Sequence, residues 1–295
     1  MVHQFGGQWT ERKLLVLEKY LQAYTTALKN FPFQKLYIDA FAGTGYRDIR
    51  REEQPGEGVQ HTLFPDLVES EPQDFLDGSA RIALQVKPHF DRYIFIERRP
   101  EHCAHLESLK SEFPALSDRI AIDQGDANIK LQQLCGMFLR KTRAVLFLDP
   151  YGMQVEWSTI EAVAQTKKID LWLLFPLGIG VNRLLKKSGD IPESWRHRLN
   201  LLLGTDDWYK EFYEKESVPT LYGDDEERLV KVKMETIGRY FNNRLKSIFA
   251  GVAEEPGVLR NSSNNPLYLL CFAVGNESGK SIALRIAQHL LKGLH

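Results

Sequence analysis

The sequence predicts an α/β fold in which a mostly parallel sheet is doubly wound by helices. Short runs that are apolar on both faces alternate with amphipathic segments of helical length, which is typical of parallel strands joined by helical crossovers. A late C-terminal strand is expected to join this sheet in the antiparallel sense. The chain has 295 residues, 43% hydrophobic and 26% charged, so it can bury a full core as one large domain or as one domain with a sizeable insertion.

The elements follow in order from the spacing of apolar residues. Leucines and tyrosines recur at helical spacing near the N-terminus and predict a helix from about Glu11 to Asn30, which Pro32 ends. Strands are predicted at residues 36–41, 93–97, 119–123, 144–149 and 169–175, and helices at 100–112 and 127–140 lie between some of them. A long helix at about residues 226–247, a strand at 266–274 and a last helix from Ser281 complete the chain.

Two stretches interrupt this rhythm and define the predicted domain organisation. Residues 46–77 are polar and rich in Pro, Gly and Glu, so they form either a surface loop or a lid. Residues 186–227 are charged and aromatic, and predict a small helical insertion that could recognise substrate or partner. The predicted units are an N-terminal helix (1–34), a core (35–185), this insertion, and a C-terminal part (228–295) that completes the core.

The charge balance excludes a general attraction to polyanions. Lys and Arg total 38, and Asp and Glu total 39, so a site for nucleic acid must be a local basic patch. Two groups are candidates for contacts with substrate phosphates: Arg47 and Arg50 in the first interruption, and Lys186 and Arg196 in the second. Each group is by default a solvated face, and the two would form a phosphate-tracking groove if they flank one pocket.

The cysteines and histidines predict no metal site. Cys103, Cys135 and Cys271 are scattered without CxxC spacing, which suits a reducing compartment. His102 and His105 share a helical face but have no third ligand nearby. The N-terminus lacks an apolar signal segment and no apolar run is long enough to cross a bilayer, so a soluble cytoplasmic protein without membrane contact is expected.

Four motifs that carry chemistry follow four predicted strands. The first, DAFAGTG at residues 39–45, places glycines at the carboxyl end of a strand, where ligands bind in open α/β sheets. Such a turn can also be purely structural. The third glycine of the dinucleotide fingerprint is missing, because Arg47 and Asp48 follow Tyr46, and this counts against NAD.

Acidic residues follow the next two strands. Glu97 can accept two hydrogen bonds from ribose hydroxyls, and without residues 46–77 it follows the glycine turn by about 20 positions, the spacing of a nucleotide-binding unit. Its alternative role is to cap a strand beside two arginines. Asp126 could accept from an adenine amino group, or serve as N-cap of the helix that begins at Ala127, and the two roles are compatible.

The fourth motif is Asp149-Pro150-Tyr151-Gly152, directly after an apolar strand. On its own it is either an ordinary turn or the edge of a pocket that holds a planar group. Its position as the fourth strand-end signal favours the pocket, because the carboxyl ends of parallel strands meet at one edge of the sheet.

Together these motifs resemble the class I S-adenosylmethionine (SAM)-dependent methyltransferases. More closely, segments along nearly the whole chain are similar to the three-Cys-motif partner protein (TcmP) family: LEKYLQAY, YIDAFAGTG, DGSARIAL, FIERRPEHC, QGDAN, FLDPYG, LLGTDDW and NNPLYLLCFA. The resemblance implies a Rossmann-like methyltransferase core, SAM as cofactor and a radical-SAM-like three-Cys-motif protein as partner. The cofactor-binding residues under this resemblance are Asp39, Phe41, Gly43, Gly45, Glu97, Asp126 and Ala127.

The Asp149 motif is similar to the Asp/Asn/Ser-Pro-Pro-aromatic motif of methyltransferases that act on base amines. In that motif the first side chain and a proline carbonyl accept from the exocyclic amine, and the aromatic ring stacks on the base. Here the second proline is missing and the aromatic comes one position early, as in the DPYG or DPFG form of tRNA guanine-N2 dimethyltransferases. Asp149, Pro150 and Tyr151 are the predicted catalytic residues, and single-stranded or structured nucleic acid is a candidate substrate.

Other functions stay open. The chain could be a catalytically silent binding module of its partner, or a methyltransferase for a protein or a small molecule. The segment VGNESGKS at residues 274–281 nearly fits a phosphate loop. A valine replaces its first glycine, however, and the chain beyond Ser281 is too short to supply a magnesium-binding strand. Its alternative role is a turn that begins the last helix.

Overall fold

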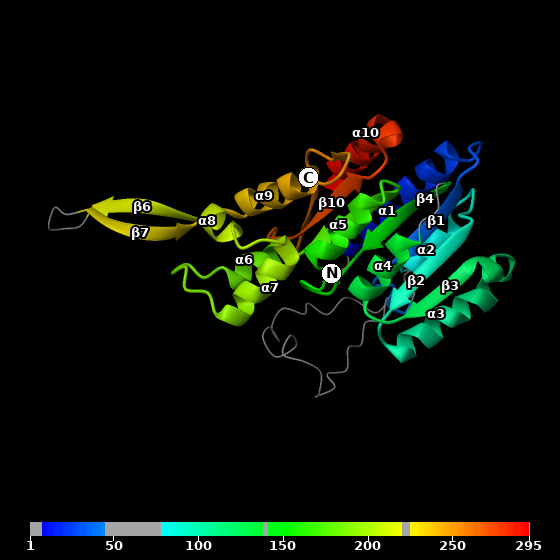
Figure 1. Cartoon of the computed structure of the whole chain (residues 1–295), viewed down its shortest axis with the longest axis horizontal. Coiled ribbons are helices and arrows are strands. Elements are labelled where there is room, and N and C mark those ends of the chain that lie inside the picture. The colour runs from blue at the N-terminus through cyan, green and yellow to red at the C-terminus, as the bar shows by residue number, and fades with distance from the viewer. Residues whose placement is uncertain (1–7, 45–77, 138–140, 220–224, 295) are drawn as a thin grey trace, which may run out of the picture.

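An eight-stranded sheet runs through the part of the chain that the structure describes. The computed structural model describes residues 8–44, 78–137, 141–219 and 225–294. The strand order is β3-β2-β1-β4-β5-β10-β8, with β9 beside β10 (Figure 1). The parallel strands are β1 (Gln34–Asp39), β2 (Arg92–Glu97), β3 (Ile120–Gln124), β4 (Thr142–Leu148) and β5 (Ile169–Phe175). The antiparallel part comprises β10 (Pro266–Val274), β8 (Gly251–Val252) and β9 (Gly257–Arg260).

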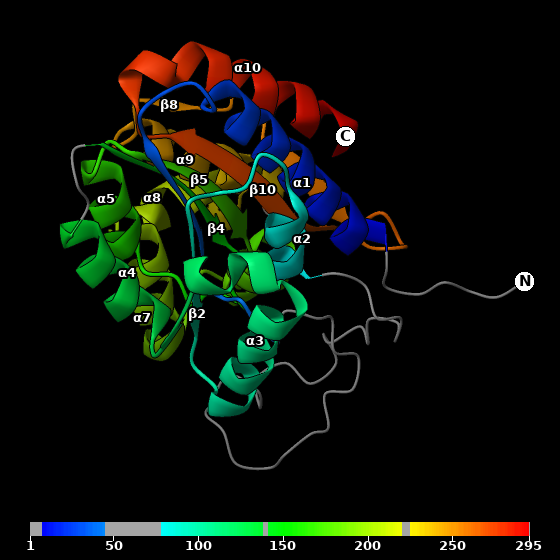
Figure 2. The ribbon, with the colours of Figure 1, turned by 90° about the vertical axis from the view of Figure 1, so that its right-hand side faces the viewer.

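Helices cover both faces of the sheet (Figure 2). One layer contains α1 (Gln8–Ala27), α2 (Ser79–Gln85), α3 (Pro100–Glu112) and α10 (Lys280–Leu291). The other contains α4 (Ala127–Gly136), α5 (Trp157–Gln165), α7 (Glu193–Leu203), α8 (Trp208–Phe212) and α9 (Met234–Lys246). Strand side chains alternate between the layers, so Tyr37 belongs to the core on the side of α1 and Ile38 to the core on the side of α5. None of the helices in the described ranges is long and apolar enough to span a membrane.

Shorter helical turns join these elements: η2 (Pro114–Arg119), η3 (Leu177–Val181), α6 (Asn182–Leu184), η4 (Glu277–Gly279) and η5 (Lys292–Leu294). Of these, η3 and α6 matter most for function, because they directly follow the carboxyl end of β5. The η3 turn is a single π-helical turn that packs closely on β10: a Cβ added at Gly178 would lie 1.9 Å from the carbonyl oxygen of Pro266.

The predicted fold class is confirmed. Strand β1 is flanked by β2 and β3 on one side and by β4 and β5 on the other, which is the Rossmann-like order expected of a class I methyltransferase fold, and β10 adds antiparallel to β5. The structure has β5, β10 and α3 at the predicted bounds. The first helix ends at Ala27 rather than near Asn30. The interruption at residues 46–77 lies outside the described residues.

The insertion after β5 differs from the prediction. Helices α7 and α8 are present, but the chain then forms a β-hairpin of β6 (Tyr213–Pro219) and β7 (Asp225–Lys231), which projects from the body of the molecule (Figure 1). The prediction of helix from residue 226 is wrong over β7, and α9 begins at Met234. The β7 sequence DEERLVK is rich in helix formers, but its backbone pairs with β6 along the whole strand, and this pairing overrides the local preference.

Two polar contacts fix α1 to the sheet, one at each edge. The hydroxyl of Tyr20 donates to Asp170 Oδ2 at 2.7 Å, at the amino end of β5. The ammonium of Lys13 donates to Asp149 Oδ2 at 2.5 Å, just past the carboxyl end of β4. The helix therefore begins beside the strand ends that carry the four motifs.

Candidate functional site

The four strand-end motifs lie in one row at the carboxyl edge of the sheet. They follow β3, β2, β1 and β4, which are consecutive neighbours. Backbone groups connect the first three: the N–H of Gly43 donates to Glu97 Oε2 at 3.0 Å, and the N–H of Gly125 donates to the carbonyl of Glu97 at 3.0 Å. The predicted motifs are therefore adjacent in space.

Glu97 is held as a carboxylate by donors on three sides. Burial raises the pKa of Glu97, but the neighbouring His102 and hydrogen bonds from the N–H groups of Arg99 and Gly43 outweigh burial and leave the pKa below its ordinary value. The N–H of Arg99 donates to Oε1 at 2.9 Å, and His102 Nδ1 lies 3.6 Å from the same oxygen. The side chain is 12% exposed, so an ionised acceptor lies at the surface of this edge.

The glycine turn after β1 combines an open surface with a buried anchor. Gly43 has a φ of +59°, a conformation that glycine adopts without strain, and a Cβ added there would meet no described atom within 4 Å. Asp39, by contrast, is fully buried. Its carboxylate accepts from the Ser79 hydroxyl at 2.5 Å and from the Phe41 N–H at 3.3 Å, so Asp39 fixes the turn and the start of α2 from beneath.

Burial dominates the electrostatics of Asp39. It raises the pKa of Asp39 to about 7, against the hydrogen bond from Ser79, and the nearby charge of Asp149 acts in the same direction as burial. The first and fourth motifs are thus electrostatically coupled.

Asp126 performs the capping role that its sequence allows. Its Oδ1 accepts from the N–H groups of Asn128 at 2.9 Å and Ile129 at 3.2 Å at the start of α4. Asp126 is exposed, and its Oδ2 accepts no hydrogen bond within the described residues, so the carboxylate can also meet a ligand. Ala127 is buried against the core and offers its backbone rather than its side chain.

Asn128 connects the third and fourth motifs, which the sequence did not reveal. Its side-chain amide donates to the carbonyl of Gln154 at 2.9 Å, and its oxygen accepts from the N–H of Glu156 at 3.0 Å and the hydroxyl of Thr159 at 3.0 Å. The chain after Asp149 is thereby fixed to the first turn of α4.

The Asp149 motif presents one residue inward and one outward. Pro150 is buried, whereas Tyr151 is 40% exposed. Gly152 has a φ of +69°, so the motif turns back at a position that suits glycine. The Asp149 side chain is 25% exposed and pairs with Lys13, whose side chain is only 6% exposed.

Lys13 is a site residue that the sequence reading missed. It lies on the buried stripe of α1 with Leu17, Tyr20 and Tyr24, at helical spacing of four, three and four residues. The ring of Trp9 covers its ammonium at 5.0 Å, and Trp9 stacks on Tyr268 with ring centroids 5.1 Å apart. The sequence does contain one signal for Lys13: it shares the helical spacing of the apolar stripe. A lysine buried in such a stripe requires a partner, which indicates a charged residue nearby.

The weaker phosphate candidates are not brought to the strand ends by any contact in the described part of the chain. Lys186 lies over the ring of Trp195 at 5.6 Å, and Arg196 over the ring of Tyr209 at 4.7 Å, both in the insertion. Gly45, Arg47 and Arg50 lie outside the described residues.

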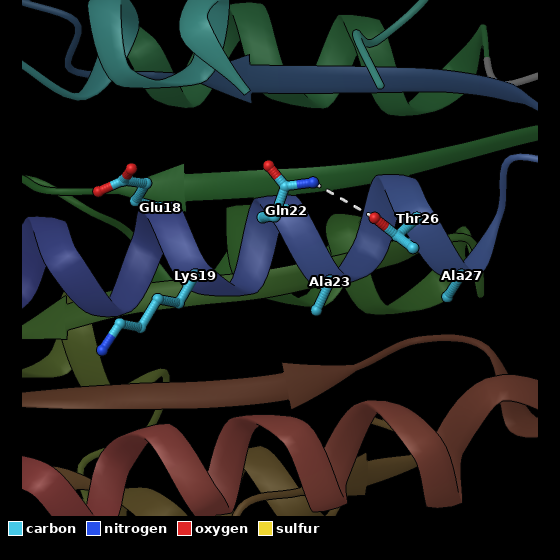
Figure 3. A pocket seen from close by; sticks show the side chains of 6 residues that line it. All are labelled: Glu18, Lys19, Gln22, Ala23, Thr26 and Ala27. Atoms are coloured by element: carbon cyan, nitrogen blue, oxygen red, sulfur yellow. Dashed lines mark hydrogen bonds between the residues drawn. The ribbon is translucent and has the colours of Figure 1, made fainter. Parts of the chain in front are cut away.

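Other candidate features lie elsewhere on the molecule. The phosphate-loop-like segment follows β10, whose end pairs with the amino end of β5, so it lies at the opposite edge of the sheet from the four motifs. Within the described segments no three His, Cys, Asp or Glu side chains gather as a metal site would require. A shallow groove runs along the outer face of α1, where Lys19 and Gln22 are among the lining residues and Gln22 donates to Thr26 (Figure 3).

The fold and the row of strand ends define the class of protein as a Rossmann-like α/β protein of the class I methyltransferase fold. No family model and no curated protein matches the chain. Among solved structures, protein LPL1258 from Legionella pneumophila, of family-model DUF519, is similar over 98% of this chain and 93% of its own, at 13% identity and a TM-score of 0.51. At that identity the likeness shows the fold alone, over nearly the whole chain.

Two further structures share a smaller likeness. A dimethyladenosine transferase from Plasmodium falciparum is 13% identical over 83% of this chain and 70% of its own, with a TM-score of 0.31. A precorrin-6y C5,15-methyltransferase from Geobacter metallireducens is 9% identical over 78% and 89%, with a TM-score of 0.28. These TM-scores are too low to support an argument about function.

Proposed function

We propose that the chain is a SAM-dependent methyltransferase. The observation that carries this proposal is the row of strand ends, in which the ionised carboxylate of Glu97 is bound to the turn at Gly43 and the Asp149 carboxylate lies two strands away. A cofactor with a ribose needs an acidic acceptor beside a turn that its backbone can approach closely. Both are present at the ends of β1 and β2.

The residues at this edge fit SAM. Glu97 would hold the ribose hydroxyls, the turn from Phe41 to Gly43 would lie against the cofactor, and Asp126 with the backbone of Ala127 would meet the adenine. No described atom would lie within 4 Å of a Cβ added at Gly43, which supports this assignment. When bound, SAM supplies a methyl group already activated on a sulfonium, and transfer to an amine yields S-adenosylhomocysteine, the methylated amine and a proton. The protein therefore mainly has to orient the acceptor.

The substrate we propose is an exocyclic amine of a nucleobase in single-stranded or structured nucleic acid. Asp149 would accept a hydrogen bond from the amine, the carbonyl of Pro150 would accept a second, and the exposed ring of Tyr151 would stack on the base or form a wall of its pocket. Lys186 and Arg196, both exposed in the insertion that follows β5, would contact phosphates.

Two measurements test the proposal. S-adenosylhomocysteine should raise the Tm of the protein, since a ligand that binds only the native state stabilises it by mass action. Labelled SAM should then deliver its methyl group to RNA or DNA, offered separately from proteins and small amines. No Tm shift at millimolar ligand contradicts the cofactor, and a shift without transfer to any acceptor supports a binding module.

A second proposed function is association with a radical-SAM-like three-Cys-motif protein. The projecting hairpin supports it, because an isolated two-stranded hairpin is marginally stable in water and gains from contact with another molecule. The hairpin is well fixed at its base: Tyr213 donates to the carbonyl of Lys186 at 2.7 Å, and Lys231 donates to those of Asn182 and Leu185 at 3.0 and 3.1 Å. Co-purification with the partner should be lost when the hairpin is replaced by a short turn.

A further inference from the structure

The ion pair between α1 and the fourth motif is asymmetric. The Lys13 side chain is 6% exposed and the Asp149 side chain 25% exposed, so the lysine approaches the carboxylate from the protein interior. The Trp9 ring lies over the ammonium at 5.0 Å, and Lys13 as a whole is buried. The exposed part of the pair is therefore the aspartate.

The two oxygens of Asp149 differ in the same way. Oδ2 accepts from Lys13 at 2.5 Å, while within the described residues Oδ1 accepts no hydrogen bond. One oxygen is thus fixed and the other is an available acceptor. Among the described residues, the charged groups recorded near Asp149 are Lys13 from α1 and Asp39 from β1, with the Tyr37 hydroxyl beside Asp39.

We propose that Lys13 is a positioning residue for methyl transfer, which fixes Asp149 through Oδ2 and leaves Oδ1 as the acceptor for the substrate amine. This inference rests on the proposed function and adds a residue from the N-terminal helix to its site. The ammonium contacts only one of the two oxygens, so the orientation of the carboxylate is fixed while its outward oxygen stays accessible.

The burial of Lys13 argues against two other roles. A substrate amine that displaced Lys13 from Asp149 would leave a buried ammonium without a partner, which is strongly unfavourable. The same burial argues against Lys13 as the methyl acceptor, because a nitrogen paired with Asp149 and covered by the Trp9 ring is poorly placed for in-line approach. Lys13 therefore acts through Asp149.

The test compares Lys13→Met and Lys13→Arg with a matched control, Lys19→Met, which makes the same change at an exposed position of α1 (Figure 3). With labelled SAM and the acceptor found for the wild type, Lys13→Met should lower kcat at least tenfold and leave the KM for SAM within twofold. Lys13→Arg should restore part of kcat because it keeps the charge. Lys19→Met should match the wild type.

A double-variant cycle with Asp149→Asn separates this inference from the proposed function. In the Asp149→Asn background, Lys13→Met should lower kcat no further. The Tm loss of the double variant should be smaller than the sum of the losses in the two single variants. Additive Tm losses, or an unchanged kcat in Lys13→Met, would overturn the positioning role alone. If the wild type methylates no acceptor while the Tm losses are still non-additive, the proposed function is wrong, and the positioning role is wrong with it.

Discussion

The two edges of the sheet contain similar polar residues that serve different purposes. Each edge has a buried aspartate: Asp39 lies at the carboxyl edge and Asp170 at the amino edge. Burial raises the pKa of each to about 7. Each edge also receives a polar side chain from α1. At the amino edge, Tyr20 and Asp170 are both buried and satisfy each other. At the carboxyl edge, Asp149 keeps one oxygen and part of its surface open.

Residue type and pKa therefore do not identify a site by themselves. What separates the edges is strand direction: the carboxyl ends of β1, β2, β3 and β4 lie on one side, so the acidic residues that follow them gather there. The amino edge has an equally perturbed carboxyl group, which accepts from Tyr20 of α1 and from the N–H of Gly275.

Removing the charge of Asp149 should have the largest effect. Asp149→Asn should lower the rate of methyl transfer by about 100-fold or more, because a charged acceptor aimed at the reacting amine is lost. Thermal shift with S-adenosylhomocysteine should show that cofactor binding remains. The matched change at the other edge, Asp170→Asn, should leave the rate within about twofold, since surrounding interactions and not catalysis depend on it. Equal losses in both variants would break the contrast between the edges.

Glu97→Gln should weaken the cofactor rather than the chemistry. A hydrogen bond to a charged group contributes roughly 1.5–3 kcal/mol, so the affinity for S-adenosylhomocysteine should fall about 10- to 100-fold. Isothermal titration calorimetry measures this directly. Glu277→Gln, the same change at an exposed position of the amino edge, provides the control and should not alter the affinity. If Glu97→Gln binds S-adenosylhomocysteine with the affinity of the wild type, the cofactor does not bind at the ends of β1 and β2.

The sequence predicts the buried strands well and the insertion poorly, for a physical reason. Every residue of β5 is buried, and so is every residue of β10 from Tyr268 to Val274, so both appear in the sequence as apolar runs, broken in β5 only by Asp170. The β7 segment is mostly charged and has no apolar alternation, and only its pairing with β6 makes it a strand. Local pattern cannot supply that information.

The candidate site divides in the same way. The acidic residues at strand ends could be predicted, because strand direction and position along the chain place them on one edge. Lys13 could not be assigned to Asp149, because the two are 136 residues apart and only the packing of α1 brings them together. Asn128 was missed as a connector for the same reason: its partners Gln154, Glu156 and Thr159 follow the next strand.

In stability, the two edges should behave alike. Asp39 and Asp170 have a folded-state pKa of about 7, well above the value of about 3.9 for an unfolded aspartate. The folded state therefore binds their protons more tightly. Their contribution to stability is fully present below about pH 4 and is lost as the pH rises to about 7, by up to roughly 1.4 kcal/mol per pH unit for each group.

Asp170→Asn removes one of these contributions, so the free energy of unfolding should fall less steeply between pH 5 and 7 than in the wild type. Asp39→Asn should have the same effect. Urea unfolding at a series of pH values measures both slopes. If only one variant changes the slope, the two buried carboxyl groups are not equivalent, and the contrast between the edges extends to stability.

The smallest effect is expected from Lys280→Met, in the segment that resembles a phosphate loop. Lys280 pairs with Glu277 at 3.2 Å, and the two side chains are 40% and 74% exposed, so losing the pair should change the free energy of unfolding by less than about 0.5 kcal/mol. The backbone here packs on β5, since a Cβ added at Gly275 would lie 2.7 Å from the carbonyl oxygen of Ile169, and this leaves no cradle for a phosphate on that side. ATP with magnesium should accordingly shift the Tm of neither the wild type nor the variant. A shift that appears in the wild type and disappears in Lys280→Met would make the amino edge a ligand site as well, and strand direction would no longer separate the two edges.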